Sequence, residues 1–244
     1  MTQSNQDLSI LSPKDSLLAR APSSYSVVRS RRKTMAIYVE HERVEVRVPI
    51  FVTKKQIQRF VEEHHDWVNK MLAHKASQYE QKPKLRDSGT IFYKGQRCVL
   101  RVSKASIESV AVHERGIAIT VRSIDEKSIA KALQRWLQNQ AREYLPNRTA
   151  ALVKHLGLQS QFKEVVFRKT KTKWGHCTVD GRIQYNWLIM LAPDAVIDYM
   201  ICHEVCHLRH MNHSKDFWRL VESVCPDYKN YQHWLKKHEH RLWF

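Results

Sequence analysis

The sequence lacks any apolar run long enough to span a bilayer, which excludes a protein built around membrane-spanning helices. The first two dozen residues contain no apolar core of the kind found in secretory signal peptides. The five cysteines are odd in number and show no disulfide framework. No internal repeat is visible. We therefore expect a cytoplasmic globular protein without a membrane partner.

Acidic residues are scarce relative to basic ones. The 244 residues include 41 Lys and Arg but only 24 Asp and Glu, which gives a formal net charge of +17. Such a charge attracts nucleotides, nucleic acid or acidic peptides, and it equally fits a solvated basic surface. No recognised nucleic-acid-binding module accompanies it. Composition therefore leaves the partner open, and it leaves the oligomeric state open as well.

The pattern along the chain predicts an α+β fold. Residues 1–24 are polar and aperiodic, and they predict a disordered tail. Residues 25–123 predict a β-rich region with one helix, which begins after the N-cap Thr53 and reaches about residue 76. Residues 124–244 predict a second, compact domain. The strands expected before that domain are 27–28, 35–39, 44–48, 90–93, 96–102, 109–112 and 116–121.

The second domain is expected to open with a long helix that kinks or restarts at Pro146 and stops at Gly157. Residues 165–172 and 183–191 predict a pair of strands around a turn at Asp180-Gly181. Three further helices are expected, one opened by Pro193 and two over about 214–224 and 227–239.

Residues 203 to 213 read H-E-V-C-H-L-R-H-M-N-H and contain the most informative motif. His203 and His207 are four residues apart, so both imidazoles lie on one helix face and can reach the same zinc ion. Glu204 between them can contact a water on that ion and take its proton. Because bound zinc lowers the pKa of water towards 7, this spacing predicts a zinc-dependent hydrolase.

His210 and His213 compete as the third ligand. On a continuous helix His210 would lie about 10 Å along the axis from His203, too far for two ligands of one ion. The chain must therefore break, and Met211-Asn212 suits a break because Asn tolerates the left-handed conformation. Ser214 then caps the next helix and leaves His213 beside it. We choose His213, which leaves a fourth position open, as in catalytic zinc sites.

The motif differs from a related zinc-site pattern at one position, and it leaves one alternative ligand to consider. The offset of the third histidine matches the metzincin pattern, but His210 stands where that pattern has glycine. A downstream glutamate, Glu222 or Glu239, is the alternative third ligand. Cys202 and Cys206 are each turned about 100° from the neighbouring histidine, so we expect them to pack as small apolar side chains.

The segment before the turn at Asp180-Gly181 predicts a basic row. On a strand, Lys169, Lys171 and Lys173 point to one side, and the residues between them, with Trp174, point to the other. Such a row beside a metal centre suits phosphate or an extended anionic peptide. A solvated edge strand that lysines protect from aggregation is the alternative. The candidate substrate contacts here are Arg168, Lys173 and Trp174.

From residue 25 onward the chain resembles the YgjP-like metallopeptidase family, relatives of the SprT and WLM proteases. The resemblance implies a zincin-like domain over residues 124–244 and hydrolysis of peptide bonds. It also implies one zinc ion on His203, His207 and His213, with Glu204 as catalytic base; other divalent metals stay open. The matching segments are 29–33, 46–49, 66–68, 171–177, 183–187, 198–199, 212–214, 217–218, 226–228 and 234–235.

One position departs from the family. His176 stands where the family usually carries serine in a Trp-Gly-Ser-Cys step. It could donate to a developing oxyanion, alter the fit of the substrate, or be an ordinary surface histidine. The resemblance also leaves two other activities open, a nucleotide pyrophosphatase and an SprT-like protease that acts on DNA-bound proteins.

Overall fold

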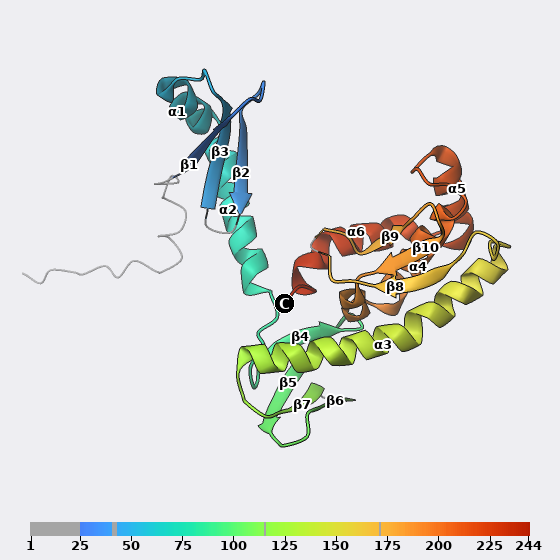
Figure 1. Ribbon diagram of the computed structural model, residues 1–244. Coiled ribbons are helices and arrows are strands. Elements are labelled where there is room, and N and C mark those ends of the chain that lie inside the picture. The colour runs from blue at the N-terminus through green and yellow to red at the C-terminus, as the bar shows by residue number, and fades with distance from the viewer. Residues whose placement is uncertain (1–24, 41–42, 115, 171) are drawn as a thin grey trace, which may run out of the picture. The chain divides into compact units, whose positions relative to one another are not determined.

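The computed structural model describes residues 25–40, 43–114, 116–170 and 172–244, so the predicted tail lies outside the described residues. The chain divides into two compact units, residues 1–80 and 81–244 (Figure 1). Both units combine strands with helices, which confirms the α+β prediction. None of the helices in the described ranges has the length and apolar character needed to cross a membrane.

The first unit is a small sheet with two helices. The sheet has the order β1-β3-β2, with β1 parallel and β2 antiparallel to β3. Val44, Val46 and Val48 alternate along β3 and are buried, as the sequence pattern predicted. The elements are β1 (Ser26–Ser30), β2 (Ala36–Glu40), β3 (Arg43–Pro49), α1 (Lys54–Glu63) and α2 (His65–Glu80).

The helical part of this unit differs from the prediction of one continuous helix. Thr53 and Gln56 form the capping box that starts α1, so the predicted start is confirmed. The predicted continuation is wrong, because the chain is interrupted at His64. Its ring Nδ1 lies 2.8 Å from the Phe60 carbonyl oxygen, and its backbone N–H bonds to Val61 instead. The side chain thus takes the carbonyl that a continuing helix would use.

The second unit begins with a four-stranded sheet in the order β4-β5-β7-β6. All four strands were predicted from the sequence. The apolar side of α3, which includes Ile129 and Leu133, is fully buried in the same core as β7. The boundary expected at residues 123–124 therefore falls inside this unit. The elements are β4 (Thr90–Tyr93), β5 (Gln96–Lys104), β6 (Ser109–His113), β7 (Gly116–Val121) and α3 (Glu126–His155).

Helix α3 runs along the unit (Figure 1). The Asp125 side chain caps it by accepting a hydrogen bond from the Ser128 backbone. The helix does not restart at Pro146, which lies inside one continuous element. The predicted stop is confirmed, because Gly157 follows the last turn with φ of +66°.

A second sheet, in the order β8-β10-β9, corrects the predicted strand pair. The turn at Asp180-Gly181 joins β9 to the antiparallel β10, whereas β8 pairs with β10 in parallel. Residues 187–191 form the short 3-10 helix η1 instead of a strand, and Asn186 starts it by accepting from the Leu188 backbone. The elements are β8 (Glu164–Phe167), β9 (Gly175–Cys177), β10 (Arg182–Tyr185) and η1 (Trp187–Leu191).

The remaining elements are helical and surround the motif helix α4. This helix packs against α3, α5, α6 and β9, so most of its residues are buried. Pro193 precedes α4, as predicted. The elements are α4 (Asp194–His207), α5 (Lys215–Val224), α6 (Tyr228–His238) and a final 3-10 turn η2 (Glu239–Arg241).

Candidate metal centre

Three histidines converge at the end of α4. The Nε2 atom of His203 lies 3.3 Å from that of His207 and 3.1 Å from that of His213. Two nitrogens that each lie 2.0–2.1 Å from a tetrahedral zinc ion are separated by about 3.3 Å. Among the described residues, these histidines are the group whose side chains could hold a metal ion. The spacing of their nitrogens fits such an ion.

The orientation of His207 is fixed by the backbone of His210. His207 Nδ1 lies 2.9 Å from the His210 carbonyl oxygen, which can only accept a hydrogen bond. Nδ1 therefore carries the proton, and the lone pair of the neutral ring lies on Nε2, towards the other two histidines. The side chain of His210 is not in the cluster. Sequence reasoning considered this residue only as a ligand and missed its carbonyl.

The chain breaks earlier than the sequence predicted. Helix α4 ends at His207, and the His210 N–H bonds to the Cys206 carbonyl. Asn212 is not left-handed, because the described non-glycine residues with positive φ lie elsewhere. The Ser214 side chain accepts from the Phe217 backbone and caps α5, as predicted. His213 directly precedes this cap, and its ring lies next to the end of α4, where it meets His203.

Aromatic rings pack against the histidines, although His213 itself is exposed. Phe217 stacks on His207 at a centroid distance of 4.4 Å, and Trp218 stacks on His213 at 5.5 Å. Burial lowers the pKa of His203 to about 3 and also lowers the pKa of His207, and neighbouring histidines add to both effects. Both rings are thus neutral, the form in which imidazole binds metal. The stacking on His207 could have been predicted from Phe217, an aromatic residue four positions after His213 in the sequence.

Glu204 lies buried beside the cluster. Burial raises the pKa of its carboxyl to about 8, while the Lys173 charge and a hydrogen bond from the Cys177 backbone oppose the increase. Its Oε2 is buried and has no hydrogen-bond partner among the described residues. A carboxylate that is shielded from water and has one unpaired oxygen can exchange a proton with a bound molecule.

Gly175 provides the space for this carboxylate. A Cβ atom added to Gly175 would lie only 2.3 Å from Glu204 Oε1. The first residue of β9 must therefore be glycine if the carboxylate is to keep this position. Gly175 lies within segment 171–177, which matches the family, but no role of its own was predicted for this glycine from the sequence. The presence of glycine between Trp174 and His176 was the sequence feature that could have indicated a close approach of the backbone at this position.

The four candidate substrate contacts differ in where they lie. Trp174 is buried and contacts Trp243 at a centroid distance of 4.7 Å, so its ring belongs to the core. Lys173 and His176 are exposed, and their charges influence the pKa of Glu204 and of His207, respectively. Arg168 is exposed, and its backbone N–H donates to the Tyr185 carbonyl oxygen.

The expected basic row on a strand is not formed. The strand β8 ends at Phe167, and the described residues between 168 and 174 are irregular. Lys171 lies outside the described residues. The Asn186 side chain donates to the Thr170 carbonyl, and its backbone N–H donates to the Trp174 carbonyl. These two hydrogen bonds from Asn186 hold Thr170 and Trp174 in place, where a strand would instead have hydrogen bonds to a neighbouring strand.

The other residues that were considered lie apart from the cluster. Glu222 and Glu239 are not among the described side chains that could hold a metal ion together. Cys202 and Cys206 are buried free thiols whose Sγ atoms are 4.0 Å apart. They pack in the core on the side of α4 that contacts the rest of the unit.

A family model described as YgjP-like, metallopeptidase domain, matches residues 33–238. The chain belongs to this family. The resemblance predicted from the sequence is thereby confirmed, and membership makes the chain a metal-dependent hydrolase of the peptidase class. The family implies a bound metal ion, and the histidine triad has the geometry to hold one. Searches of curated proteins and of solved structures found no match.

Proposed function

We propose that this YgjP-like chain is a zinc-dependent peptidase in which His203, His207 and His213 hold the ion. The observation that carries the proposal is the convergence of three Nε2 atoms at the spacing of tetrahedral ligands. Three imidazoles without a carboxylate suit zinc better than magnesium or calcium, which prefer oxygen ligands. When bound, zinc supplies a Lewis acid and lowers the pKa of water towards neutrality.

Glu204 is the general base in this proposal. It adjoins His203 on α4, and its unpaired Oε2 is free to accept a proton from the attacking water. The same carboxyl then passes the proton to the leaving amine. Its raised pKa supports both roles, because a base that must also act as an acid works best with a pKa near the operating pH.

Lys173, Gly175 and His176 have smaller roles near the centre. Lys173 acts on Glu204 through its charge and favours the ionised form of the base. His176 projects from β9, where it can contact a substrate or help to stabilise a developing oxyanion. Gly175 keeps the carboxylate in place by allowing β9 to approach α4 closely.

A paired substrate assay tests the proposal. Metal-free protein is reloaded with zinc, manganese or magnesium and then assayed on an unfolded protein and on nucleoside triphosphates. We expect zinc-dependent peptide cleavage that a chelator abolishes. Triphosphate hydrolysis with manganese or magnesium, without proteolysis, would overturn the proposal in favour of a pyrophosphatase. Cleavage that requires added DNA would instead support an SprT-like protease.

A further inference from the structure

The first unit has an apolar tip in the turn between β3 and α1. Ile50 is 60% exposed and Phe51 is 80% exposed, although they are adjacent and both strongly apolar. Val48 and Val52, which lie before and after this pair, are buried in the core of the unit, but Ile50 and Phe51 are not part of that core. Isolated exposed apolar residues are ordinary, but an adjacent pair at the tip of a turn has a solvation cost that a binding partner would remove.

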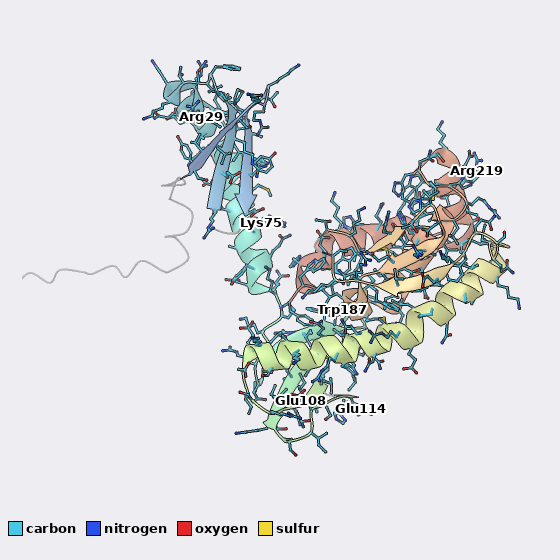
Figure 2. All side chains as sticks on the ribbon, viewed as in Figure 1. Arg29, Lys75, Glu108, Glu114, Trp187 and Arg219 are labelled. Carbon is cyan, nitrogen blue, oxygen red and sulfur yellow. The ribbon has the colours of Figure 1, made fainter. Side chains whose placement is uncertain are left out.

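The backbone of this turn is paired internally. The Nη1 atom of Arg29, a residue labelled in Figure 2, donates to the carbonyl oxygens of Ile50 and Val52, at 2.8 and 2.7 Å. The Val52 N–H bonds to the Pro49 carbonyl. Carbonyl groups that already have a protein donor cost less to move into an apolar medium than groups that rely on water. The tip is thus ordered and suited to leave water.

Basic side chains surround the apolar tip. Residues 29–35 and 46–61 contain lysine and arginine but no aspartate or glutamate. Strand register brings the two segments together, because Ser30 at the end of β1 pairs with Pro49 at the end of β3. Within these two segments, the exposed cations with no hydrogen bond or ion pair among the described residues are Arg31, Lys33, Lys54 and Lys55.

We propose that this end of the unit docks on a bilayer surface that contains anionic lipid. Ile50 and Phe51 would enter the boundary between headgroups and acyl chains, while the surrounding cations contact headgroup phosphates. Nucleic acid would satisfy the cations but would leave the exposed Ile50 in water, so the apolar pair favours a bilayer. Surface docking needs no membrane-spanning helix, but it departs from the expectation, drawn from the sequence, of no membrane partner. It is independent of the proposed peptidase activity.

Sedimentation of the full chain with lipid vesicles tests the proposal. We expect the protein to sediment with vesicles of phosphatidylcholine and phosphatidylglycerol at low salt, but not with phosphatidylcholine alone. Replacing the apolar pair, Ile50→Ser with Phe51→Ser, should weaken binding about tenfold or more. Reversing two charges, Lys54→Glu with Lys55→Glu, should weaken it about fivefold or more for each residue. Added salt should weaken binding as well.

Matched variants in the second unit serve as controls. Ile107→Ser with Val179→Ser removes two exposed apolar side chains, and Lys127→Glu with Lys131→Glu makes the same change in net charge. Both controls should bind vesicles like the original chain, and thermal melting checks that every variant is folded. No binding to the mixed vesicles, or full binding by both tip variants, would overturn the proposal. So would tip variants that lose affinity for a DNA oligonucleotide but not for vesicles.

Discussion

The candidate centre has two walls that are encoded in different ways. The helical wall consists of α4, the loop after it and the start of α5, and it provides all three histidines within eleven consecutive residues. The strand wall consists of β9 and the segment before it, and it places Gly175 and the Cys177 backbone against Glu204. Local spacing sets the first wall, whereas packing between distant segments sets the second.

This difference separates two properties of the site. The histidine nitrogens converge through contacts within the helical wall, including the bond between His207 and the His210 carbonyl. The position and pKa of Glu204 depend on the strand wall. We therefore expect loss of a histidine ligand to remove the metal, and changes to Glu204 or to the strand wall to reduce turnover while the metal stays bound. Four predictions test this separation.

The largest effect is expected from His213→Ala. Removing one of three imidazoles should cost more metal affinity than the 10–100-fold loss typical of a residue that only orients a ligand. Metal content after dialysis, measured together with kcat, checks the prediction. His210→Ala is the matched control, because its carbonyl rather than its ring contacts His207. The separation fails if the His210 variant loses metal and the His213 variant keeps it.

Glu204→Gln should abolish turnover without removing the metal. The amide keeps the shape of the carboxylate but cannot accept a proton, so kcat should fall by about 10²–10⁴-fold. The measurement is kcat alongside zinc content at equal protein concentration. Full activity in this variant would eliminate Glu204 as the base. Loss of the metal would mean that Glu204 also helps to hold the histidines in position.

Gly175→Ala tests the strand wall through its closest contact. The added methyl would overlap Glu204 Oε1, so either the carboxylate or β9 must move. A displacement of about 1 Å can cost about 100-fold in rate, and we expect kcat to fall by that order with metal content unchanged. His176→Ala, a change at the next and exposed position, should have a smaller effect. An unchanged kcat for Gly175→Ala would show that the close approach is not required.

Much of the helical wall could be predicted because its signals are local. The spacing of His203 and His207, the distance argument against His210 and the cap at Ser214 all depend on residues within one or two helical turns. The structure brings these groups together as expected, although the break comes at the end of α4 rather than at Asn212. The strands before α3 were predictable for the same reason, because in each of them apolar or β-branched residues alternate or cluster between turn residues.

The strand wall was harder to predict because distant pairing decides it. The apolar positions Ile183, Tyr185 and Trp187 continue with strand periodicity, yet the strand stops when Asn186 caps a 3-10 helix. All of residues 187–191 are buried, so their apolar character does not distinguish a strand from a helix. The parallel pairing of β8 with β10 could likewise not be predicted from the residues within either strand. The contact of Gly175 with Glu204 follows from that sheet and was therefore missed.

The smallest effect is expected from Trp243→Ala, because Trp243 contacts the strand wall through the buried ring of Trp174. Its ring contacts Trp174, and Lys169 ties the last residue down by donating to the Phe244 carbonyl oxygen at 2.8 Å. Because Trp243 is only half-buried, Trp243→Ala should cost less than the 3–5 kcal/mol of a fully buried Trp, about 1–2 kcal/mol. Denaturant unfolding measures this cost. We expect kcat to fall less than tenfold, and Trp243→Phe to recover most of both properties because an aromatic contact remains. Loss of metal in the alanine variant would show that the two walls are coupled.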